Sequence, residues 1–127
     1  MSLTYTLSPK LTTKVRQIIQ RTPFDHIHPN RVTCVESKGS KSRAYARIYA
    51  FPRVWQEALG LKPHYVIEVL SEKFNKLSQT QKDRVLIHEL LHIPKTFSGA
   101  LTPHKCFGKR IDAKTVEKFY RQYKNRN

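Results

Sequence analysis

The sequence has few of the residues that mark disulfide-rich, fibrous or membrane proteins. Its 127 residues include two cysteines, four glycines and one methionine. Two cysteines are too few for a disulfide scaffold, so we expect free thiols and an intracellular, cytoplasmic protein. No apolar run approaches the roughly 20 residues of a membrane-spanning helix, and the first residues lack the pattern of a secretory signal. These absences predict one globular domain over residues 1–127, without a membrane partner.

Acidic residues are also scarce, with nine Asp and Glu against 24 Lys and Arg, which gives a net charge of +15. The positive charge is dense only in residues 105–127, which carry eight of these basic residues. Four of them recur at helical spacing on one predicted face: Lys114, Lys118, Arg121 and Lys124. Two interpretations stay open for this C-terminal helix: an ordinary solvated face, or a surface that binds the phosphates of nucleic acid.

Hydrophobic periodicity and turn residues predict an α+β chain. Apolar residues at helical spacing, beside capping residues, predict helices at residues 9–21, 55–59, 79–93 and 113–123. Alternating or continuous apolar residues predict strands at residues 31–37, 43–51 and 65–70. Residues 38–41 are typical of a turn, so we expect the first two strands to pair as a hairpin. The expected fold has a small, mostly antiparallel three-stranded sheet, an active-site helix and a C-terminal helix.

The helix predicted at residues 79–93 carries a pattern with catalytic chemistry. His88 and His92 are four residues apart, so their imidazoles point to the same side of a helix, one turn apart. Both rings can then bind one zinc ion at the usual distance of about 2.0–2.1 Å. Glu89 follows about 100° round the helix, where it can reach water at the metal without binding the metal itself. Chance would give this His-Glu-x-x-His pattern about 0.01 times in a chain of this composition.

The residues around this pattern are apolar: Val85, Leu86, Ile87, Leu90, Leu91 and Ile93. A buried helix does not tolerate two imidazoles and a carboxylate without a partner, and a metal ion supplies one. A catalytic zinc also needs a third protein ligand and an open position. His104 is the preferred third ligand, because a turn at Ser98-Gly99 can lead the chain back. Glu117, Cys106 and Asp112 remain as alternatives.

Other polar residues have weaker patterns. His26 and His28 lie in a polar loop, where histidines are usually solvated, so we do not favour a second metal site there. A donor for the developing oxyanion is expected, and Tyr120, Tyr123 and Lys105 are equally good candidates.

Residues 88–92 (HELLH), followed by Phe97-Ser98-Gly99 and His104-Lys105, resemble the zincin metallopeptidases. In detail they are similar to a family of small phage and archaeal metallopeptidases, and more distantly to the SprT/Spartan-like minimal proteases. The chain departs from these patterns at two positions: Pro94 directly follows Ile93, where many zincins continue the helix, and Lys95 stands where metzincins have glycine. These departures argue against a close relation to the metzincins.

The resemblance implies a minimal zincin-like fold and a set of residue roles. His88, His92 and His104 would bind Zn²⁺, and Glu89 would be the general base of a metalloendopeptidase that acts on protein or peptide substrates. One strand of the predicted hairpin would then be an edge that pairs with extended peptide. Two other functions remain open: a basic nucleic-acid-binding domain with a structural zinc, and a protease that acts on DNA-bound proteins.

Overall fold

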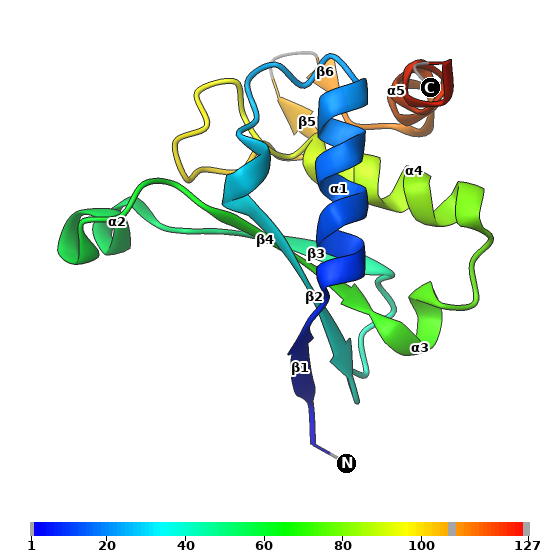
Figure 1. The fold of residues 1–127 in the computed structure, drawn as a ribbon, viewed down its shortest axis with the longest axis horizontal. Coiled ribbons are helices and arrows are strands. Elements are labelled where there is room, and N and C mark those ends of the chain that lie inside the picture. Colours follow the sequence, from blue (N-terminus) through cyan, green and yellow to red (C-terminus); the bar gives the residue numbers. More distant parts are fainter. Residues whose placement is uncertain (1, 107–108, 126–127) are drawn as a thin grey trace.

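A four-stranded mixed sheet forms the centre of the fold (Figure 1). The computed structural model describes residues 2–106 and 109–125, with only the backbone for residues 105, 106, 109 and 110. The sheet has the order β1-β2-β4-β3, from β1 (Thr4–Leu7), β2 (Val32–Lys38), β3 (Ala46–Ala50) and β4 (Tyr65–Leu70). β2 and β4 run parallel, whereas β1 and β3 lie antiparallel on the two outer sides.

The predictions of three strands and of a hairpin between the first two are wrong, whereas two of the three pairings in the sheet are antiparallel, as expected. β4 lies between β2 and β3 and pairs with both, so these two strands do not pair with each other. β4 is buried at all but one position, which is typical of a central strand with a parallel neighbour. β1 was not predicted: Tyr5 and Leu7 alternate with threonines, but the run is short and all four of its residues are exposed. The α+β class itself is confirmed.

The described residues form five α-helices: α1 (Pro9–Arg21), α2 (Arg53–Leu59), α3 (Ser71–Phe74), α4 (Gln79–Leu90) and α5 (Ala113–Asn125). A 3₁₀ turn (Pro29–Arg31) precedes β2, and the short strands β5 (Lys105–Cys106) and β6 (Lys109–Arg110) pair before α5. None of the described helices has the length and apolar character needed to cross a membrane.

Polar side chains cap the N-terminal ends of the three longest helices. Ser8 accepts a hydrogen bond from the backbone of Leu11 at the start of α1. Ser78 and Gln81 form a capping box at the start of α4, and Asp112 accepts from the backbone of Thr115 in α5. These side chains satisfy backbone donors that the first helical turn leaves unpaired.

The predicted end of the active-site helix is wrong by three residues. α4 ends at Leu90, and residues 91–93 form a turn in which the N–H of His92 donates to the carbonyl of Glu89 at 3.1 Å. The helix therefore tightens before Pro94. His92 lies in this turn, not within the helix proper.

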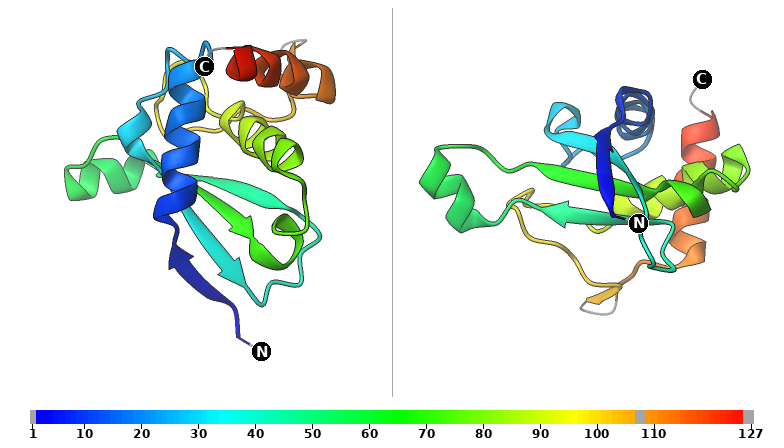
Figure 2. Two further views of the ribbon diagram at one scale, coloured as in Figure 1. Left: turned by 45° about the vertical axis from the view of Figure 1, so that its right-hand side comes forward. Right: turned by 90° about the horizontal axis from the view of Figure 1, so that it is seen from below.

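One apolar cluster joins the sheet to α1, α4 and α5. It contains Val15 and Ile18 from α1, Ile67 from β4, and Leu86 and Leu90 from α4. α5 lies beside α4 in both orientations (Figure 2). The core thus holds α4, the active-site helix, against the sheet. The C-terminal end of α4 lies beside the loop that follows this helix.

α2 is the exception to this packing. It connects β3 to β4 and projects away from the other elements in every view (Figures 1 and 2). It has no buried residue, and the side chain of Trp55 is 56% exposed. Gly60 ends the helix with φ of 64°, a left-handed conformation that glycine adopts without strain.

We expect Ser78→Ala to lower the free energy of unfolding by about 1 kcal/mol, because it removes the capping oxygen of α4. Urea denaturation followed by circular dichroism measures this change. Ser78→Thr keeps a hydroxyl and should cost less. An alanine variant as stable as the wild type would show that the capping box does not stabilise α4.

Candidate active site

Three histidine side chains meet beside the C-terminal end of α4. Ligand atoms of His88, His92 and His104 all lie within 4.8 Å of one another. The Nε2 atoms of His88 and His104 are separated by 3.2 Å. Two nitrogens bound tetrahedrally at about 2.05 Å from one ion lie roughly 3.3–3.4 Å apart. The spacing therefore fits a shared ion of the size of zinc.

The backbone at Thr102 brings the third histidine to the cluster. Nδ1 of His92 donates to the carbonyl oxygen of Thr102 at 2.5 Å, and the N–H of Thr102 donates to the carbonyl of His92 at 2.7 Å. Because a carbonyl only accepts, the proton of this imidazole is on Nδ1, and Nε2 is left to bind a metal. His104 follows two residues later. This contact could not be predicted from the sequence, because the acceptors of both hydrogen bonds and the donor of one are backbone atoms.

The loop before Thr102 is attached to the rest of the protein at two further points. The hydroxyl of Tyr65 accepts from the N–H of Gly99 at 3.0 Å and donates to the carbonyl of Ala100 at 2.8 Å. Gln56 of α2 donates to the carbonyl of Ser98 at 3.1 Å. Gly99 has φ of 94°, and a Cβ there would lie 2.5 Å from the carbonyl oxygen of Phe51. Only glycine fits this close turn.

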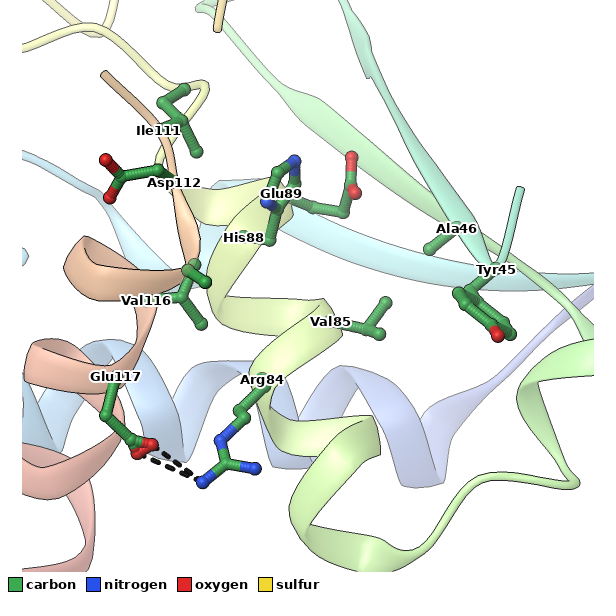
Figure 3. Close-up of a pocket in the computed structure, with 11 residues that line it drawn as sticks. Tyr45, Ala46, Arg84, Val85, His88, Glu89, Ile111, Asp112, Val116 and Glu117 are labelled. Atoms are coloured by element: carbon green, nitrogen blue, oxygen red, sulfur yellow. Dashed lines mark hydrogen bonds and ion pairs between the residues drawn. The ribbon is translucent and has the colours of Figure 1, made fainter. Parts of the chain in front are cut away.

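Glu89 is buried next to the histidine cluster, with 9% of its surface exposed. Burial raises the pKa of its carboxyl to about 7. A carboxyl group with a pKa near neutrality can take up and return a proton, although a nearby cation would lower that pKa. In Figure 3 the side chains of His88 and Glu89 both lie at the upper part of one cavity.

Burial also acts on the metal-binding candidates. It lowers the pKa of His88, and positive charge on His92 and His104 would lower it further. The pKa of His92 is lowered mainly by burial as well. Both imidazoles are therefore neutral over a wider range of pH than usual, which is the form that binds metals.

A cavity of about 750 Å³ opens from His88 and Glu89 between α4, α5 and the start of β3 (Figure 3). Its other lining residues are Tyr45, Ala46, Arg84, Val85, Ile111, Asp112, Ala113, Val116 and Glu117. Sequence reasoning did not predict this cavity. Val85, one turn before His88, could have been found from helical periodicity, but the walls from β3 and α5 depend on tertiary packing.

Two of the alternative third ligands have other partners. Both carboxylate oxygens of Glu117 accept hydrogen bonds from Arg84 Nη2, at 2.6 and 3.0 Å. Asp112 accepts from the backbone N–H and the hydroxyl of Thr115, both at 3.0 Å. The side chain of Cys106 lies outside the described part of the structure. Among the described side chains, His104 is the alternative that joins His88 and His92.

The tyrosines considered as oxyanion donors contact other elements. The hydroxyl of Tyr120 donates to Thr80 Oγ1 near the start of α4, at 3.3 Å. Tyr123 is buried, and its hydroxyl accepts from Lys14 of α1 at 3.0 Å. The side chain of Lys105, the third candidate, lies outside the described part.

The loop histidines support the turn after α4. Nε2 of His26 lies 3.1 Å from the carbonyl oxygen of Ile93, and the ring of exposed His28 packs edge-on against Phe97. Neither belongs to a group of metal-binding side chains among the described residues. Their contacts are structural.

A comparison with protein families agrees with these observations. A family model described as "Putative phage metallopeptidase" matches residues 3–124. No curated protein and no solved structure gives a significant match. The matched range covers the whole sheet, the three histidines and Glu89, and it confirms the resemblance stated from residues 88–105. The chain therefore belongs to this family of phage metallopeptidases.

Proposed function

We propose that the protein is a zinc-dependent metalloendopeptidase with one zincin-like domain. The observation that carries the proposal is the cluster of three imidazoles beside Glu89, a buried glutamate of α4. In this proposal His88, His92 and His104 bind the metal, and Glu89 is the general base. Three nitrogen ligands with a fourth position left open are typical of catalytic zinc. Family membership adds that the substrates are proteins or peptides.

The side chains of the site have separate tasks in peptide hydrolysis. A zinc ion held by the three imidazoles would supply Lewis acidity, which makes water a usable nucleophile at neutral pH. Glu89 accepts the proton of the attacking water and delivers it to the leaving amine. The carbonyl of Thr102 keeps His92 in the tautomer that presents Nε2.

The outer strand β3 offers a place for the substrate main chain. β3 pairs with β4 on one side and is the last strand in the sheet order, so its other edge is open within the described residues. Ala46 of this strand lines the same cavity as His88 and Glu89. An extended peptide added to this edge would pass beside the catalytic residues, held by hydrogen bonds between main chains.

A second function rests on a different observation, the basic face of α5. Val116 and Tyr123 are buried, whereas the four basic residues on the opposite side are exposed: Lys114, Lys118, Arg121 and Lys124. With a net charge of +15, this face suits the phosphates of nucleic acid. Such binding would direct the peptidase to proteins bound to DNA.

We expect Glu89→Gln to keep bound zinc and to lose about 10²–10⁴-fold in the rate of peptide hydrolysis, because the amide cannot accept the proton of water. Caseinolysis and elemental analysis of the same samples measure the two properties. Glu57→Gln, at an exposed glutamate of α2, is the matched control and should have wild-type activity. Full activity of Glu89→Gln would refute the role of general base.

We expect wild-type protein to hold about one zinc per chain, and His104→Ala to weaken zinc binding together with the loss of activity. Removal of a residue that only supports a ligand lowers metal affinity by about 10–100-fold, and removal of a direct ligand should lower it further. Competition with a chromophoric chelator measures the affinity. His64→Ala, at an exposed histidine in the loop before β4, and Glu117→Ala should keep the metal. Unchanged zinc affinity of His104→Ala would show that the third ligand is another residue.

We expect weak binding to duplex DNA that falls steeply between about 50 and 200 mM salt, because bound phosphates release counterions. Fluorescence anisotropy of a labelled duplex measures the affinity. Lys118→Glu with Arg121→Glu should reduce it further than Lys38→Glu with Lys76→Glu, which reverses two exposed charges outside α5. Equal effects of the two pairs would mean that α5 has no particular role.

A further inference from the structure

We propose that the face of the sheet opposite the core binds single-stranded nucleic acid, with unpaired bases stacked on exposed tyrosines. This surface is separate from the histidine cluster and from α5, so the inference does not depend on peptide hydrolysis. The basic face of α5 suits the phosphates of any nucleic acid, whereas stacking on the sheet needs bases that are free of a duplex.

The strand register divides the sheet into a covered face and an open face. Cys34, Ile67 and Ile48 lie opposite one another on three neighbouring strands and pack in the core, to which α1, α3, α4 and α5 also contribute. Successive side chains of a strand point to opposite faces, so Val35 and Glu68 lie on the other face. The helices α1, α4 and α5 lie together on one side of the sheet (Figure 1), and α2 has no buried residue. The open face therefore has no helix packed on it within the described residues.

Aromatic side chains lie on the open face. Tyr49 is in β3, and Phe51 follows two residues later, where its N–H continues the ladder to the carbonyl of His64 at 3.2 Å. Tyr5 of β1 pairs with Ser37 on the same face. The two tyrosines, Tyr49 and Tyr5, are 44% and 59% exposed. Alternate residues of a strand are about 6.6–6.8 Å apart, which is comparable with the spacing of successive bases in an extended strand. Such rings on a sheet form a platform for stacked bases.

A hydrogen bond within the open face fixes the ring of Tyr49. Its hydroxyl donates to Oε1 of buried Glu68 at 2.7 Å, and this bond raises the pKa of Tyr49. A ring that is already held in place loses less conformational freedom when a base stacks on it. Arg47 lies directly opposite Glu68 in the register, on the same face, so its positive charge offsets the carboxylate. The centre of the face therefore does not repel phosphates strongly.

The charge around the open face favours a polyanion. Residues 38–62, which contain β3 and the connections on both sides of it, include six Lys and Arg against one acidic residue, Glu57. Glu57 pairs with Arg53 at 3.7 Å. A second copy of the chain would bring the same excess of positive charge against this face, and a net charge of +15 opposes such an association. A single strand supplies both the bases for the rings and the phosphates for the cations.

The experiment compares two labelled strands of about 12 nucleotides by fluorescence anisotropy. One is oligothymidine and the other is an abasic strand with the same phosphates and no bases. The full-length wild type should bind the thymidine strand at least about 5-fold more tightly, since each stacked base contributes about 5–150-fold. Tyr5→Ala combined with Tyr49→Ala should bind the two strands with nearly equal affinity.

Three control proteins separate stacking from other effects. Tyr5→Phe combined with Tyr49→Phe keeps both rings and should keep the preference for the thymidine strand. Tyr45→Ala removes a tyrosine that is 47% exposed but lines the cavity beside α4, and it should also keep the preference. Lys118→Glu with Arg121→Glu on α5 should weaken binding of both strands by a similar factor and leave their ratio unchanged.

Each other outcome contradicts the proposal. Equal wild-type affinities for the two strands, or an unchanged ratio in the double alanine variant, would show that bases do not stack on this face. A wild-type dimer in sedimentation velocity that the double alanine variant loses, without a preference for thymidine, would assign the face to self-association instead. Should Tyr49→Ala fail to fold by circular dichroism because Glu68 loses its partner, Tyr5→Ala alone decides, and it should lower the affinity for the thymidine strand at least about 5-fold.

Discussion

Burial of one side of α4 is the constraint on which the rest of the site depends. Leu86, Ile87 and Leu90 have no exposed surface and fix the rotation of the helix against the core. Once that rotation is fixed, the directions of the neighbouring side chains at positions 88 and 89 are fixed as well, because successive residues of a helix are turned by about 100°. His88 and Glu89 therefore face the cavity as a consequence of core packing, and no contact of their own is needed to direct them there.

α5 and the loop that carries His104 contact α4 through polar side chains. These contacts position the two segments but add little to the stability of the fold. The ion pair between Arg84 and Glu117 is partly exposed, so its effect on the free energy of unfolding is small. Its two short hydrogen bonds nevertheless set where α5 lies relative to α4. The reciprocal bonds of His92 and Thr102 do the same for the loop that carries His104. The site thus combines one packed helix with two segments that are tethered to it.

The sequence predicted the parts of the structure that local chemistry determines. The helices that begin after Ser8, Ser78 and Asp112 are capped by these residues, because an N-cap needs only a side-chain oxygen and the first turn beside it. The spacing of His88 and His92 likewise needs no tertiary information. Parallel pairing of β2 with β4 depends on contacts across more than 30 residues, and alternation of apolar residues does not distinguish it from a hairpin. The cavity has the same origin, since its walls come from three elements far apart in the chain.

The exposed position of α2 has a consequence for spectroscopy. Trp55 is the single tryptophan of the chain, and it already lies mostly in water. Its fluorescence therefore changes little when the core unfolds, whereas circular dichroism follows the helices that pack in that core. The hydrogen bond from Gln56 to Ser98 ties α2 to the loop that leads to His104, and not to the core. Different transition curves from these two signals would reflect where the tryptophan lies, and would not by themselves indicate a folding intermediate.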